Sequence, residues 1–433
     1  MQTTDDLLRG MRVTVVGLGR FGGGVGAANF LASRGAKVTV SDQADEEILS
    51  ESVAQLTDDS ISLALGGHRE CDFFDTELLV VNPAFPKTHP LLVEATRRGV
   101  PRTSEINLFL ERCPADMVGI TGSVGKSTTV SMCGEVLSRR YRTHVGGNIG
   151  RSLLGDLEQI GPEDIVVLEL SSFQLEDIPL VGVSPRVGLV TNLIPNHLDR
   201  HGTMEAYASA KQNLLRYRAQ RGVTLLNAAA PELADWPAVA GGRVEWYNLP
   251  DDEPFDLRVP GDHNQANAQA AWAVGRALGI ERHDAEDALK NFHGLAHRLE
   301  LVADHDGVQY FNDSKCTTPR GAEVALTAFE PETAVILLGG YDKGATWDEL
   351  GREVSKRAKR AVCFGQTGPA IAEAIRTAGM EPFTADTLDE AFALAQREAA
   401  DGDTVLLSPA CASWDQFTNY EERGERFTQL AKG

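Results

Sequence analysis

The segment from Gly119 to Thr128, "GITGSVGKST", carries residue types that bind phosphate. The backbone amides beside its glycines can surround phosphate oxygens, the ammonium of Lys126 can reach the β and γ phosphates, and the hydroxyl of Ser127 can ligate Mg²⁺. A strict P-loop has a glycine five residues before the Gly-Lys pair, where this chain has Ile120. Its position between an apolar strand and an apolar helix nevertheless favours a nucleotide-binding loop.

Further polar side chains stand where apolar strands end. The run "IVVLEL" contains Glu169, and "VGLVTN" is followed by His197. Ligands of open α/β sheets bind beyond the carboxyl ends of the strands, so these groups can hold a metal that bridges phosphate oxygens. The alternatives are a helix cap or ion pair for Glu169 and a hydrogen-bonded loop histidine. His201 follows His197 at the spacing of some zinc sites, but no third soft ligand stands near.

The last third of the chain repeats this pattern of polar groups at strand ends. The clusters are Asp313 to Lys315, Tyr341 to Lys343, and Ser408 to Ser413. Any single lysine is by default an exposed surface cation. Two lysines at strand ends that face one crevice would suit a substrate carboxylate or a phosphoryl group in transfer.

Near the N-terminus, Gly17 to Gly22 follows a strand, and Asp42 lies about 20 residues further on, as in a dinucleotide-binding fingerprint. This pattern fits a nicotinamide cofactor, another nucleotide diphosphate, or only a tight turn between strand and helix. No later motif supports hydride chemistry.

Short apolar runs alternate with helical patterns along the whole chain, which predicts an α/β protein with parallel sheets. The 433 residues suggest two or three domains. We expect a Rossmann-like domain over 1–104, a central P-loop ATPase-like parallel-sheet domain over 105–296, and a Rossmann-like domain over 297–433. Asp306-Gly307 predicts a hairpin turn at the start of the third domain.

Composition excludes several classes of protein. The formal net charge of −21 argues against a nucleic-acid partner. No segment has the length and apolarity of a membrane helix, and the acidic N-terminus is unlike a signal peptide, so we expect a cytoplasmic protein without membrane insertion. The six cysteines form no Cys-x-x-Cys pair, which indicates neither a zinc knuckle nor a disulfide framework.

Taken in order, the motifs resemble those of the Mur ligase family over nearly the whole length. They are "TGSVGKST", "GGNIG", "ELSSFQLE", "NHLDRH", "YASAK", "GDHNQANAQAA", "HRLE", "NDSKCT", "LLGGYDKG" and "LSPACASWDQFTNYEERG". This family uses a shortened Gly-x-x-Gly-Lys-Ser/Thr loop, which accounts for Ile120.

The resemblance implies a monomeric ATP-dependent amide ligase of peptidoglycan synthesis that uses two Mg²⁺ ions. Its small-molecule substrates would be UDP-N-acetylmuramoyl-L-alanine and D-glutamate, joined through an acyl phosphate. Alternatives are a sister Mur ligase, a variant that adds L-glutamate or another amino acid, and folylpolyglutamate synthase. An NAD-dependent oxidoreductase and a P-loop switch protein are alternatives of other classes.

The resemblance also implies roles for individual residues. The catalytic set is Lys126, Glu169, His197 and Lys211. The ATP set is Gly122, Ser123, Val124, Gly125, Lys126, Ser127, Thr128, Asn264, Asn267, Arg298 and Asp313. The metal set is Ser127, Glu169, His197 and Lys211, the lysine being carbamoylated by CO₂. The UDP-substrate set is Gly17, Leu18, Gly19, Arg20, Phe21, Asp42, Gln43, Asn148, Ser171 and His197. The glutamate set is Lys315, Thr317, Lys343, Ser413 and Tyr420.

The first domain departs most from the family pattern. The segment "VNPAFPKTHP" stands where the family has a Ser-Pro-Gly run, and Gly22 to Gly24 is unusually glycine-rich. In a Mur ligase the glycine fingerprint would bind UDP instead of NAD.

Overall fold

The computed structural model describes residues 6–20, 22–149, 152–217, 222–342 and 344–433. They form two compact units: Met1–Glu253 with Asn267–Ala285, and Pro254–Ala266 with Glu286–Gly433. Within the described residues, no helix has the length and apolarity needed to cross a membrane.

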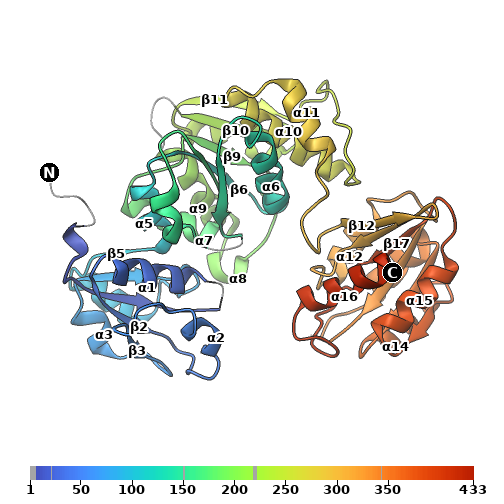
Figure 1. Ribbon diagram of the computed structural model, residues 1–433, viewed down its shortest axis with the longest axis horizontal. Coiled ribbons are helices and arrows are strands. Elements are labelled where there is room, and N and C mark those ends of the chain that lie inside the picture. The colour runs from blue at the N-terminus through green and yellow to red at the C-terminus, as the bar shows by residue number, and fades with distance from the viewer. Residues whose placement is uncertain (1–5, 21, 150–151, 218–221, 343) are drawn as a thin grey trace. The chain divides into compact units, whose positions relative to one another are not determined.

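The first sheet lies in the blue part of the chain and has the order β3-β2-β1-β4-β5, all paired parallel (Figure 1). Its strands are β1 Arg12–Val16, β2 Lys37–Ser41, β3 Ser62–Ala64, β4 Leu78–Val81 and β5 Arg102–Thr103. Its helices are η1 Asp6–Leu8, α1 Gly23–Ser33, α2 Ser50–Val53, α3 Glu70–Phe74 and α4 Pro90–Arg97. The central strands are buried because crossover helices cover a parallel sheet on both faces.

The second sheet belongs to the same compact unit, is also parallel, and has the order β11-β10-β9-β6-β8-β7. Its strands are β6 Asp116–Thr121, β7 Thr143–Gly147, β8 Ile165–Glu169, β9 Val187–Val190, β10 Val223–Asn227 and β11 Arg243–Tyr247. The helices around it are α5 Glu105–Arg112, α6 Lys126–Leu137, η2 Leu154–Gln159, α7 Ser172–Leu175, η3 Ile178–Leu180, α8 Leu198–His201, α9 Met204–Arg216, η4 Pro231–Leu233 and η5 Trp236–Val239.

Helices α10 Asp262–Ala277 and α11 Arg282–Lys290 each have residues in both units. The third sheet, in the second unit, has the order β12-β13-β17-β14-β15-β16. Its strands are β12 Glu300–His305, β13 Val308–Asn312, β14 Ala334–Gly339, β15 Arg360–Phe364, β16 Phe383–Ala385 and β17 Thr404–Leu407. Its helices are α12 Pro319–Leu326, α13 Asp348–Arg357, α14 Gly368–Thr377, α15 Leu388–Glu398 and α16 Tyr420–Lys432.

Strand β14 illustrates why this third sheet is stable: all six of its residues are buried. Ile336 and Leu338 pack into one apolar cluster, and Val335 and Leu337 pack into the other. Among the described strands of this sheet, only β12 is antiparallel to its neighbour. The turn at Asp306 and Gly307 joins it to β13 with positive φ at both residues, as the sequence predicts. The α/β class with three sheets is confirmed.

Candidate active site

The loop that joins β6 to α6, residues 122–125, is called the phosphate loop below. It has glycine where no other residue fits. At Gly122, φ is 152° and a Cβ atom would lie 1.9 Å from the hydroxyl oxygen of Thr191. At Gly125, φ is 81° and a Cβ atom would lie 2.7 Å from Oδ1 of Asn267. The loop therefore packs closely against Thr191 and Asn267, and it leads into the N-terminus of α6, whose amides favour an anion.

Two amides of this loop point to a single oxygen. The N–H groups of Ser123 and Val124 donate to Oδ1 of Asn192, at 3.2 and 3.0 Å. Paired amides of this kind suit a phosphate oxygen. The side chain of Val124 is 52% exposed, so the backbone alone makes these contacts. Sequence reasoning missed Asn192, although it follows directly on the run "VGLVT" that ends β9.

Two lysines lie at this loop. Lys126 begins α6, and Lys211 comes from α9, where it is 1% exposed and donates from Nζ to the carbonyl of Gly122 at 2.8 Å. Burial, followed by the charge of Lys126, lowers the pKa of Lys211 to about 7, while the carboxylate of Glu169 acts in the opposite sense. Both burial and the charge of Lys126 therefore favour the neutral form of this amine.

Glu169 ends β8 beside the loop and is 3% exposed. Its Oε1 accepts a hydrogen bond of 2.9 Å from Nδ2 of Asn148. Its Oε2 is buried without a hydrogen-bond partner among the described residues. An orphaned carboxylate oxygen beside a phosphate loop is a good ligand for Mg²⁺. The described residues contain no group of three or more His, Cys, Asp or Glu arranged to hold a metal ion.

His197 is exposed and has a left-handed backbone, with φ of 54°. Its ring centroid lies 5.0 Å from that of Phe173. Partial burial, then the charges of Lys126 and Lys211, lower its pKa. The imidazole is therefore largely neutral at neutral pH, which is the form that can ligate a metal.

The surroundings of His201 argue against a zinc site formed with His197. Its Nε2 lies 2.9 Å from the hydroxyl of Ser172, and its Nδ1 lies 3.2 Å from Oε1 of Glu176. Both ring nitrogens are thus engaged away from His197. The nearby Ser171 caps α7 in a capping box with Gln174, so its hydroxyl already has a structural role.

The N-terminal glycine loop is held by Asp42. This side chain accepts from the amide of Gly19 at 3.1 Å and from that of Ala44 at 2.9 Å. Leu18 is fully buried and presents no surface to a ligand, whereas Arg20 and Gln43 are exposed. The predicted UDP-substrate residue Phe21 lies outside the described residues.

The loop after β4 is held by helix α8 within the same unit. Arg200, three residues after His197, donates to the carbonyls of Ala84 and Pro83 at 2.8 Å and of Phe85 at 3.0 Å. Its guanidinium also lies over the ring of Phe173, 5.0 Å from the centroid. The unusual segment "NPAFP" thus meets the segment that carries the candidate catalytic histidine.

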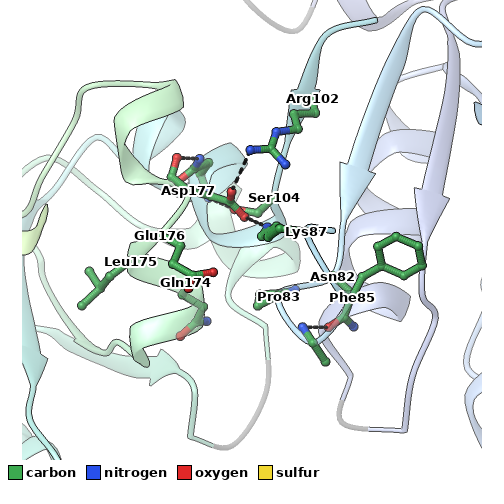
Figure 2. Close-up of polar contacts among 12 residues, drawn as sticks. Asn82, Pro83, Phe85, Lys87, Arg102, Ser104, Gln174, Leu175, Glu176 and Asp177 are labelled. Carbon is green, nitrogen blue, oxygen red and sulfur yellow. Dashed lines mark hydrogen bonds and ion pairs between the residues drawn. The ribbon is translucent and has the colours of Figure 1, made fainter. Parts of the chain in front are cut away.

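Asp177 makes a second contact between distant segments of this unit. Figure 2 shows Asp177, which is 1% exposed, paired with Lys87 and with Arg102 at 3.9 Å. The carbonyl of Asp177 accepts from Nδ2 of Asn107 at 2.7 Å. Sequence patterns gave no signal for Asp177 or Arg200, because Asn107 and the carbonyls of Pro83 to Phe85, to which they are hydrogen-bonded, are 70 or more residues distant in the chain.

Of the predicted ATP residues, Asn267 lies at the phosphate loop and accepts from the hydroxyl of Thr129 at 3.1 Å. Asn264, Arg298 and Asp313 belong to the second unit. The carboxylate of Asp313 accepts from the hydroxyl of Ser408 at 2.7 Å, and burial raises its pKa to about 7.

The predicted glutamate residues of the second unit follow its adjacent strands β13 and β17. Lys315 is exposed, with Nζ 5.3 Å from the ring centroid of Tyr420, a cation–π contact. Ser413 is 2% exposed and Thr317 is half-buried. Lys343 lies outside the described residues.

Three family models match the chain in succession. They are the MurD-like N-terminal domain of Mur ligases over residues 11–104, the Mur ligase middle domain over 120–253, and the glutamate ligase domain of Mur ligases over 297–411.

Similar proteins agree with these matches. A UDP-N-acetylmuramoylalanine–D-glutamate ligase of Pelotomaculum thermopropionicum is 38% identical over 97% of each chain, and one of Symbiobacterium thermophilum is 40% identical over 97% of this chain and 98% of its own. Among solved structures, the UDP-N-acetylmuramate-alanine ligase MurC of Thermotoga maritima shares the fold with a TM-score of 0.62 at 20% identity, covering 98% of this chain and 99% of its own. The chain belongs to the Mur ligase family.

Proposed function

We propose that the protein is an ATP-dependent ligase that adds D-glutamate to UDP-N-acetylmuramoyl-L-alanine in cytoplasmic peptidoglycan synthesis, acting as a monomer. The observation that carries this proposal is the 38–40% identity, over 97% of the chain, to ligases named for that reaction. The phosphate loop, the orphaned oxygen of Glu169 and the buried Lys211 support ATP as the source of energy.

The chemistry follows from the poor reactivity of a carboxylate. The alanyl carboxylate oxygen attacks the γ phosphorus of ATP. The bond between that phosphorus and ADP breaks, and an acyl phosphate forms. The glutamate amine then attacks the acyl carbon, loses a proton, and expels inorganic phosphate to leave the amide. Backbone amides of the loop and Lys126 would hold the phosphates in line and offset the charge that develops on them.

The donor set fits Mg²⁺, which would neutralise phosphate charge when bound. One ion would take the hydroxyl of Ser127 and the orphaned Oε2 of Glu169. A second would take His197 and a carbamate on Lys211. A neutral lysine amine adds to CO₂, forming an N–C bond and releasing a proton, so burial beside Lys126 favours this modification.

The remaining family roles are proposals of the same kind. The amide of Asn148, beside Glu169, would orient the acceptor substrate. The glycine loop with Asp42 would bind UDP, because residues 11–104 match the MurD-like N-terminal domain of Mur ligases. Lys315, Thr317, Ser413 and Tyr420 would bind glutamate, together with Lys343.

Phosphate release tests the proposed function directly. Wild-type enzyme with ATP and UDP-N-acetylmuramoyl-L-alanine is expected to release phosphate in proportion to amide formed when D-glutamate is added. L-Glutamate and other amino acids serve as comparisons. Release at the same rate with every amino acid, or with none, would overturn the ligase assignment. Faster turnover with L-glutamate would instead revise the handedness of the substrate.

Replacing Arg200 by methionine is expected to weaken the binding of the UDP-linked substrate selectively. Loss of its three carbonyl contacts frees the loop at 82–86, and contacts of a charged donor contribute ~1.5–3 kcal/mol each at most. We therefore expect a KM for that substrate about tenfold higher, with the KM for ATP little changed. Arg186→Met is the matched control, because Arg186 forms an exposed ion pair with Asp116. Equal effects of both variants would refute this role of Arg200.

A further inference from the structure

Helix α16 places a charged side chain in the interior of the second unit. Arg423 is 0% exposed. Its Nε donates to the hydroxyl of Ser314 at 2.9 Å, and its Nη2 donates to the carbonyl of Ser314 at 2.7 Å and to that of Cys411 at 3.1 Å. All three acceptors are neutral. Its Nη1 is buried with no hydrogen-bond partner among the described residues.

These contacts lie at the carboxyl ends of three adjacent strands. Ser314 follows β13 and Cys411 follows β17. Gly340 follows β14, and a Cβ atom on it would lie 3.1 Å from Nη1 of Arg423. One planar guanidinium therefore fixes two loops and closely approaches a third. Lysine has no comparable fork of donors.

The loops that Arg423 fixes are those with the candidate glutamate residues. Lys315 is the next residue after Ser314, and Ser413 is two residues after Cys411. The helix that carries Arg423 begins at Tyr420, whose carbonyl accepts from the hydroxyl of Ser314 at 2.8 Å.

Among the residues that the structure describes, no carboxylate forms a hydrogen bond or ion pair with Arg423. Burial lowers its pKa to about 10, while the thiol of Cys411, the carboxylates of Asp415 and Asp313 and the thiol of Cys316 act in the opposite sense. The group is therefore cationic at neutral pH. A buried cation without a paired anion costs stability, so its presence among substrate loops suggests a functional benefit.

We propose that Arg423 is a positioning and specificity-determining residue for the incoming acidic amino acid. It holds the loops of Lys315 and Ser413 in one arrangement and places a buried positive charge behind them. This inference rests on the proposed function, because it assumes that glutamate binds at these loops.

Steady-state kinetics of Arg423→Met and Arg423→Lys test the inference. Arg426→Met is the control, since Arg426 lies on the same helix, is partly exposed and pairs with Asp389. Arg423→Met is expected to raise the KM for D-glutamate at least about tenfold, the loss expected for hydrogen bonds of a charged group. The KM for ATP should change less than about twofold. Arg423→Lys, which keeps the charge, should retain more preference for D-glutamate over D-glutamine than Arg423→Met.

The outcomes separate this inference from the proposed function. Wild-type turnover that does not depend on glutamate defeats the proposed function. Glutamate-dependent wild-type turnover, combined with an unchanged glutamate KM in Arg423→Met or with equal rises for ATP and glutamate, defeats the role of Arg423. If Arg423→Met does not fold, Ser314→Ala with wild-type Arg423 provides the test: a selective rise in the glutamate KM supports the inference, and no rise overturns it.

Discussion

Lys211→Ala is expected to reduce amide formation at least about 100-fold, the upper range for losing a group that supports a bound metal. Added formate or acetate should restore part of the lost activity. Alanine leaves space where the lysine stem was, and a small carboxylate in that space would replace the oxygen atoms of the proposed carbamate.

The reason for this expectation lies in the surroundings of Lys211. Its ammonium is buried beside a second cation, Lys126, and donates to the backbone of the phosphate loop. A permanently charged lysine would repel the metal, whereas the carbamate would offer it oxygen ligands. Mass spectrometry of the intact protein in bicarbonate buffer checks the modification independently, as an increase of one CO₂ that Lys211→Ala lacks.

Two further variants serve as controls for Lys211→Ala. Lys211→Met removes the amine but fills the space, so small carboxylates should not restore its activity. Lys290→Ala removes an exposed lysine that pairs with Asp256 and should keep the wild-type rate. Wild-type activity of Lys211→Ala, or equal rescue of the methionine variant, contradicts the carbamate.

The strand-end rule accounts for most of what the sequence predicted correctly. Apolar runs located β6, β8 and β9, and Glu169 lies at the same edge of the sheet as the loop after β6, because parallel strands present their carboxyl ends at one edge. The left-handed turn at Asp306-Gly307 was predictable because its φ values are local properties.

The features that were missed depend on packing between distant segments. From the sequence, Arg200 is expected to be an ordinary surface arginine. Its role becomes visible only in the folded structure, where the loop near Ala84 contacts it. Asn192 is one of many polar residues after a strand, and only the turn at Gly122 brings the amides of the loop to it. Arg423 is a polar residue in the sequence pattern of α16, and that pattern does not predict that its side chain is fully buried.

Glu169→Gln separates catalysis from folding, because the two are expected to respond differently. The substitution keeps an oxygen for Asn148 but removes the charge from an orphaned, buried position. A buried charge without a partner costs free energy, so the Tm of the ligand-free variant is expected to equal or exceed that of the wild type. Turnover should nevertheless fall at least about 100-fold, since a neutral amide is a poor ligand for Mg²⁺.

Thermal unfolding with ligands makes this prediction independent of activity. Binding to the folded state raises Tm, so ATP with Mg²⁺ should stabilise the wild type more than ATP with EDTA. In Glu169→Gln that magnesium-dependent increment should disappear, while Glu163→Gln, a change in the exposed turn before β8, should keep it. A full increment in Glu169→Gln would show that the metal binds elsewhere, and a large fall in ligand-free Tm would show that the carboxylate is structural.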